Sequence, residues 1–133
     1  GLEVDALGGA PGVASARYGG EGLDDAGRAA MLLEALAGIP EPERSARFRC
    51  VMVLLPAPGR PAHALVAEGI LEGRIAAAAA GRGGFGYDPV FIPLGEAGTL
   101  AEIGADGKNA ISHRYRALEE MRALLEGGAA GVE

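Results

Sequence analysis

Residues 48–70 read FRCVMVLLPAPGRPAHALVAEGI and predict a β-hairpin. The apolar run over 48–55 is typical of a well-buried strand. Prolines and a glycine over 56–61 predict a turn, and 62–70 predict a strand that returns antiparallel to the first. A fold organised around this segment therefore contains strands that pair locally.

Two helices are predicted, one before the hairpin and one after it. Residues 23–37 carry apolar side chains at helical spacing, and Asp24 and Asp25 in the first turn complement the helix dipole. Residues 109–126 show the same spacing, and Lys108 lies at the expected start of this second helix.

Shorter segments complete a mixed α and β pattern. Residues 2–7 alternate apolar and acidic side chains, as a half-buried strand does, and 90–92 predict a short strand. Residues 71–79 fit either a further strand or a helix, because their alanine run has high helix propensity. With no internal repeat and no long linker, residues 1–133 are expected to form one α/β domain.

Composition excludes several classes of protein. The chain has 133 residues, a net charge of −6 and no apolar run of the roughly 18 residues that a membrane span needs. Few cations are available to neutralise a phosphate backbone, which argues against a nucleic-acid polymer as partner, although a small polyanion carried with a divalent metal remains open. The single cysteine, Cys50, cannot form an internal disulfide, which suits the cytoplasm.

A glycine-rich loop is the first candidate for chemistry. Residues 83–89 read GGFGYDP, and the glycines on both sides of Phe85 allow the backbone to approach a ligand closely. An aromatic ring on such a loop can stack on a purine, which contributes about 1–3 kcal/mol per base. The alternative is an ordinary turn in which Phe85 and Tyr87 fill the core.

A second cluster lies at the expected start of the last helix, where residues 108–114 read KNAISHR. A helix N-terminus attracts phosphate and Lys108 adds a full charge, while His113 and Arg114 supply further hydrogen-bond donors. The alternative is a solvated basic face in which Ser112 or Asn109 caps the helix.

Other candidates are weaker. Glu3 and Asp5 share one strand face and could bind Mg²⁺, although acidic side chains on a strand face are more often simply solvated. Cys50 is expected to be an inert core thiol, and His63 is expected to be exposed. No zinc-site spacing and no serine-hydrolase motif is present.

Four segments in order resemble the inosine triphosphate pyrophosphatase family, also called XTP/dITP diphosphatases. The segments are GLEVDAL (1–7), PGV with SARY (11–18), GGFGYDP (83–89) and KNAISHR (108–114). The resemblance implies a long mixed sheet with flanking helices and two lobes around a central cleft. It also implies hydrolysis of ITP, dITP and XTP to the monophosphate and pyrophosphate, with Mg²⁺, by a cytoplasmic homodimer.

The resemblance also implies roles for individual residues. Phe85 would stack on the base, Lys108 would contact the substrate, and Arg114 would reach the C6 oxygen edge of the base together with His113. Adenine carries an amino donor at C6, so a site of donors would reject it, by a factor on the order of 10⁴. The implied substrate-binding residues are Phe85, Gly86, Tyr87, Asp88, Lys108, His113 and Arg114.

The chain departs from the family pattern in several ways. The family's general-base aspartate, triphosphate-binding segment and metal-binding glutamate precede the position of Gly1, so the chain would be the C-terminal two-thirds of the fold, with little or no activity alone. Alternatives are a non-catalytic nucleotide-binding or interaction protein, or a fragment that does not fold stably. Tyr115 replaces a glycine and is expected to crowd the base pocket, and residues 104–107 are expected to loosen the approach to Lys108.

Overall fold

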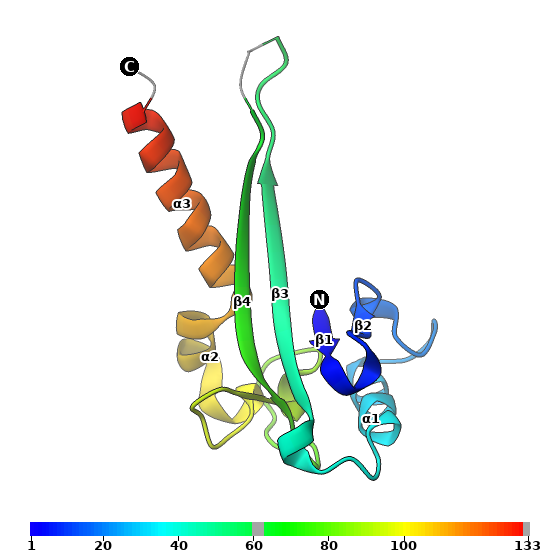
Figure 1. Cartoon of the computed structure of the whole chain (residues 1–133). Helices are drawn as coiled ribbons and strands as arrows, with labels where there is room; N and C mark the ends of the chain where they lie inside the picture. Colours follow the sequence, from blue (N-terminus) through cyan, green and yellow to red (C-terminus); the bar gives the residue numbers. More distant parts are fainter. Residues whose placement is uncertain (60–62, 132–133) are drawn as a thin grey trace.

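The computed structural model describes residues 1–59 and 63–131, with side chains up to residue 127. Five strands form one sheet in the order β2-β1-β3-β4-β5, and three α-helices pack around it (Figure 1). The α/β class is therefore confirmed, although all four pairings among the described strands are antiparallel rather than mixed. The elements are β1 Leu2–Val4, β2 Pro11–Gly12, α1 Asp25–Ala35, β3 Ser45–Leu54, β4 Leu65–Ile75, β5 Phe91–Pro93, α2 Leu100–Ile111 and α3 His113–Gly131.

The predicted hairpin is confirmed and is longer than expected. β3 and β4 pair antiparallel from Ser45↔Arg74 to Leu54↔Leu65. Residues 71–79, for which the sequence allowed either a strand or a helix, therefore continue β4 as far as Ile75. Residues 76–79 form no helix.

The expectation of a well-buried strand over 48–55 was wrong for its second half. Val51 and Val53 are 54% and 56% exposed, because the hairpin extends beyond the rest of the sheet (Figure 1). Cys50 is accordingly half-buried rather than a core thiol. β1 is also shorter than the predicted strand 2–7, since Asp5–Leu7 form a 3₁₀ turn.

The two edges of the hairpin have different surroundings. Along β4, Glu120 Oε2 accepts the Glu68 N–H at 2.9 Å and Arg116 Nη1 donates to the Ile70 carbonyl at 2.7 Å, so side chains of α3 cover this edge. Along β3, the last ladder bonds on the other side join Arg49 to Gly1. Among the described strands, none pairs with that edge over residues 50–54.

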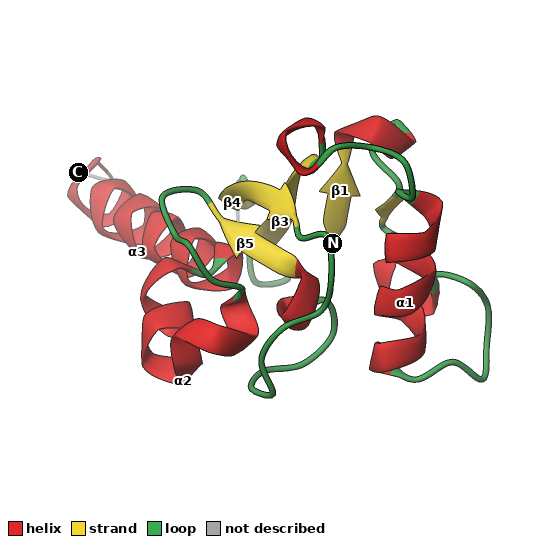
Figure 2. Cartoon of the chain, turned by 90° about the horizontal axis from the view of Figure 1, so that it is seen from below, coloured by secondary structure: helices red, strands yellow, loops and turns green. Residues whose placement is uncertain are grey.

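The first helix confirms its prediction. Asp24 caps α1 by accepting the Gly27 N–H at 2.7 Å, and the apolar side chains at helical spacing face the core, with Leu32 and Leu36 fully buried. Figure 2 shows α1 beside β1, on the opposite side of the molecule from α2 and α3.

The predicted helix 109–126 was wrong in its boundaries. The chain forms α2, with a capping box between Thr99 and Glu102 and a non-helical residue at Gly104 (φ 83°), and then a separate α3. Lys108 therefore lies in the last turn of α2 rather than at its start, and residues 105–107 are helical, whereas Gly104 forms a kink within α2. α3 lies along β4 and buries Ala117 and Met121.

Candidate functional site

One cavity of about 530 Å³ brings together the two candidate clusters of the sequence. The glycine-rich loop forms one wall, and the junction of α2 and α3 forms another. Residues of β1, of β2 and the turn after it, and of α1, β3 and β4 line the remainder. All seven sequence-predicted residues line this cavity, namely Phe85, Gly86, Tyr87, Asp88, Lys108, His113 and Arg114.

The two aromatic residues of the loop have different environments. Phe85 is 56% exposed, whereas Tyr87 is 6% exposed and its hydroxyl donates to the Ser15 carbonyl at 2.7 Å. Burial raises the pKa of Tyr87, which keeps the hydroxyl protonated as a donor. The core-filling alternative is therefore correct for Tyr87, while Phe85 is free to meet a ligand.

Asp88 connects the loop to α2. Its carboxylate is 5% exposed, accepts the Phe85 N–H at 3.0 Å and forms an ion pair with Lys108. The Lys108 ammonium in turn lies 3.8 Å from the centroid of the Phe85 ring, and the Arg114 guanidinium carbon lies 5.4 Å from it. Two cations that can donate hydrogen bonds, Lys108 and Arg114, thus lie close to the exposed Phe85 ring.

His113 is neutral at physiological pH. Its pKa is lowered to about 4, chiefly by burial and to a lesser extent by the nearby N-terminal ammonium, Arg114 and Lys108, against an opposing effect of Asp88. Its ring stacks on Phe48, with 5.0 Å between centroids and 15° between planes. A neutral imidazole offers one donor and one acceptor to the cavity.

Glu3 of β1 and Asp5 of the 3₁₀ turn that follows it do not form a metal site. Asp5 accepts hydrogen bonds from Arg47 at 2.9 Å, which hold the pKa of Asp5 below its usual value, and Glu3 accepts one from Arg49 at 2.9 Å. Within residues 1–59 and 63–131 no group of three or more His, Cys, Asp or Glu side chains is placed to hold a metal ion. The residues present therefore do not by themselves fit the Mg²⁺ site that the resemblance implies.

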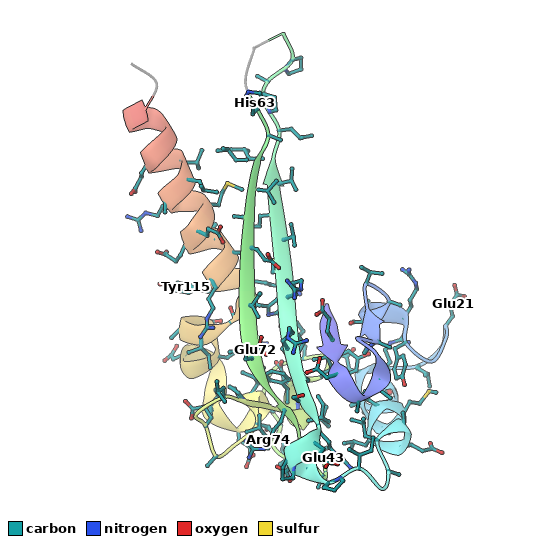
Figure 3. The ribbon with its side chains drawn as sticks, in the orientation of Figure 1. Glu21, Glu43, His63, Glu72, Arg74 and Tyr115 are labelled. Carbon is teal, nitrogen blue, oxygen red and sulfur yellow. The ribbon has the colours of Figure 1, made fainter. Side chains whose placement is uncertain are left out.

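Tyr115 does not crowd the cavity. It is 45% exposed, is absent from the cavity lining and points away from β4 (Figure 3). His63 is exposed near the far end of the hairpin, as predicted (Figure 3). No helix in the described part of the chain is long and apolar enough to cross a membrane.

Three contributors to the site were not found from the sequence. Ser15 accepts the hydrogen bond of Tyr87, Phe48 stacks on His113, and Asp25 accepts a hydrogen bond from the loop at Gly86. Each lies far along the chain from its partner, so no local pattern could have paired them. The local signals were the SARY segment that contains Ser15 and a second aspartate directly after the residue that caps α1.

Comparison with known proteins identifies the family. The sequence pattern of the Ham1 family matches residues 1–124. The chain belongs to the Ham1 family. Two solved Ham1 structures share its fold. The HAM1 protein from Coxiella burnetii has a TM-score of 0.86 at 44% identity, and the Staphylococcus aureus Ham1 protein has a TM-score of 0.88 at 39% identity. Each comparison covers 96% of this chain and 64% of the other.

Curated Ham1 relatives are named dITP/XTP pyrophosphatase. The protein from Shouchella clausii is 46% identical over 127 residues, which are 96% of this chain and 63% of the relative. The protein from Geobacillus kaustophilus is 50% identical over 121 residues, which are 91% of this chain and 58% of the relative. The chain thus spans about three fifths of the length of these relatives.

Proposed function

We propose that this chain carries the base- and sugar-binding site of a nucleoside-triphosphate pyrophosphatase that converts ITP, dITP and XTP to the monophosphate and pyrophosphate. The observation that carries the proposal is the exposed Phe85 ring in a 530 Å³ cavity, next to the cations of Lys108 and Arg114. The names of the curated relatives support the same substrate class.

The recognition chemistry follows from hydrogen-bond polarity. Hypoxanthine and xanthine present an oxygen acceptor at C6, and the Arg114 guanidinium can only donate. Adenine would place an amino donor against this donor, leaving both groups without a partner in a partly enclosed site. Neutral His113 and Lys108 add donors nearby, so the cavity favours 6-oxopurines over adenine.

The reaction is proposed to require Mg²⁺, as the resemblance implies. Because the described residues do not fit a metal site, we assign no step of base recognition to the metal. The affinity of the chain for inosine monophosphate should therefore be the same in excess Mg²⁺ and in EDTA. A different affinity for inosine monophosphate in Mg²⁺ and in EDTA would contradict the proposal that base recognition does not involve the metal.

We also propose that the enzyme works in the cytoplasm as a homodimer. The lone half-buried cysteine is consistent with a reducing compartment. Val51, Val53 and Val66 lie on one face of the hairpin, each more than half exposed, which supports association through this surface. Sedimentation equilibrium of the wild type and of Val53→Lys tests the dimer, because a lysine in such an interface should shift the protein to monomer.

Calorimetric titration with ITP, XTP and ATP tests the substrate class. We expect binding of ITP and XTP and binding of ATP that is weaker by at least about a hundredfold. Equal affinity for ATP would overturn the proposal.

Pyrophosphate release in Mg²⁺ provides the second arm, and this chain alone is expected to turn over slowly. Selective binding with no pyrophosphate release would favour a non-catalytic nucleotide-binding role for the chain, since the described residues include no metal cluster.

A further inference from the structure

Two adjacent aspartates at the start of α1 have different contacts. Asp24 accepts the Gly27 N–H at 2.7 Å and so caps its own helix. Asp25 instead accepts the N–H of Gly86, 61 residues further along the chain, through Oδ2 at 2.9 Å. The helix therefore has its cap without Asp25, whose carboxylate joins α1 to the glycine-rich loop.

This contact fixes the backbone on one side of Phe85. The Phe85 N–H donates to Asp88 Oδ2 at 3.0 Å, and the next N–H in the chain, that of Gly86, donates to Asp25. Gly86 has φ 60°, a left-handed conformation that glycine adopts without strain. Because the Phe85 side chain is 56% exposed, packing of the ring does little to hold this backbone, and the two carboxylates do so instead.

The loop also separates two cavities. Asp25, Phe85 and Gly86 line both the cavity of about 530 Å³ and a neighbouring one of about 410 Å³ on the side of α1. That second cavity is bordered by the small side chains of Ala26, Ala29 and Ala30, so it leaves space into which the loop could move. The Asp25–Gly86 hydrogen bond spans this space from helix to loop.

We propose that Asp25 is a positioning residue, which holds the loop through Gly86 so that the Phe85 ring faces the cavity in an orientation suited to stacking on a purine base. The expected effect on nucleotide affinity rests on the proposed function, but the positioning of the loop can be measured without a nucleotide. The proposal predicts that the accepting oxygen of residue 25 matters more for the position of the loop than the negative charge does.

The experiment compares Asp25→Ala, Asp25→Asn and Asp24→Ala in the full chain. The first removes the acceptor, the second keeps an amide oxygen in its place, and the third removes a carboxylate of equal charge one residue away. Inosine monophosphate affinity is measured by calorimetry, amide hydrogen exchange at Gly86 by NMR, and stability by thermal unfolding.

We expect Asp25→Ala to bind inosine monophosphate about tenfold more weakly and to exchange the Gly86 amide faster, because the hydrogen bond that orders the loop is lost. Asp25→Asn should stay within about threefold of the wild type in affinity. Asp24→Ala should lower the melting temperature while affinity and Gly86 exchange stay at wild-type values, since only the helix cap is lost.

Two results would overturn the positioning role. One is Gly86 exchange in Asp25→Ala at the wild-type rate, which needs no ligand to observe. The other is an equal loss of affinity in Asp24→Ala and Asp25→Ala, which would assign the effect to the stability of α1. Failure of the wild-type protein to bind inosine monophosphate would instead overturn the proposed function and leave the exchange measurement to decide the role of Asp25.

Discussion

A Cβ atom on Gly69 would lie 1.9 Å from the carbonyl oxygen of His113, so the absence of a side chain in the middle of β4 lets the start of α3 rest directly on the strand. The same Cβ would lie 2.3 Å from the Ala117 backbone nitrogen. Gly69 does not line the cavity. It nevertheless determines how closely His113 and Arg114, the first residues of α3, approach the cavity from the sheet.

Replacing Gly69 by alanine should therefore affect both stability and binding. The clashing atoms belong to backbone, so α3 must move away from β4, at a cost of about 2 kcal/mol typical of overpacking. His113 and Arg114 would move with it, and inosine nucleotide affinity should fall. Urea unfolding and calorimetric titration measure the two effects.

Gly107→Ala is the matched control for this substitution. A Cβ at Gly107, inside α2, would meet nothing closer than 3.6 Å, and alanine in a helix is favoured over glycine by about 1 kcal/mol. This variant should be as stable as the wild type or more so. If Gly69→Ala were as stable as Gly107→Ala, the close approach of α3 to β4 would not require a glycine at position 69.

The depressed pKa of His113 predicts a loss of stability in acid. The unfolded histidine has a pKa near 6.5 and the folded one a pKa of about 4, so between these values the unfolded state binds more protons. Stability contributed by neutral His113 is complete above about pH 6.5 and declines as the pH falls toward 4, by at most about 3 kcal/mol. Urea unfolding across this range should show the decline.

A histidine variant separates this effect from carboxylate titration. His113→Gln should flatten the profile between pH 6.5 and 4, because the side chain whose pKa is lowered on folding is then absent. Identical profiles for wild type and His113→Gln would mean that His113 ionises in the folded protein as freely as in the unfolded chain.

Lys108→Met should destabilise the protein by about 2 kcal/mol, because it leaves the buried Asp88 carboxylate without its cation. Adding Asp88→Asn should restore part of this stability, since the charge that lacks a partner is then gone. The free energies of unfolding of the two single variants and the double variant measure the coupling.

A surface ion pair provides the comparison. Arg122 is 69% exposed and pairs with Glu126, so Arg122→Met should change stability by no more than about 0.5 kcal/mol. An equally small effect of Lys108→Met would show that water screens the Lys108–Asp88 pair as effectively as it screens the surface pair.

Arg114→Met should reduce discrimination between bases. Loss of the guanidinium removes a donor for the C6 oxygen, so affinity for ITP should fall by about tenfold while the weak affinity for ATP stays the same or improves. Parallel titrations with the two nucleotides give the ratio. An equal loss of affinity for ITP and ATP would place Arg114 at the phosphates or the sugar instead of the base.

Local patterns in the sequence predicted the parts of the fold that local forces determine. The hairpin followed from the strand–turn–strand pattern, and α1 followed from its spacing and its acidic first turn. The start of α2 was missed although Thr99 and Glu102 have the spacing of a capping box, because the helix was expected to begin only after the glycines at 104 and 107.

Burial of individual side chains could not be predicted, because it depends on contacts between distant segments. Phe85 and Tyr87 are two residues apart in the same motif, yet only Tyr87 reaches the Ser15 carbonyl, 72 residues away in the chain. Val51 and Val53 were expected in the core because they are apolar, but both are more than half exposed, although α3 lies along the hairpin (Figure 1). Seven residues that line the cavity were found by their motifs, whereas the contact of Asp25 with Gly86 depends on the folded loop.

The two edges of the hairpin differ in whether a further strand could pair with them. Glu120 and Arg116 occupy the hydrogen-bonding positions that another strand would need beside β4 at Glu68 and Ile70. Beside β3, the ladder with β1 ends at Arg49, and the backbone groups of Val51 and Val53 continue the same row. A polypeptide that joins this sheet along the hairpin must enter on the β3 side, and one that prolongs the ladder of β1 must run antiparallel to β3.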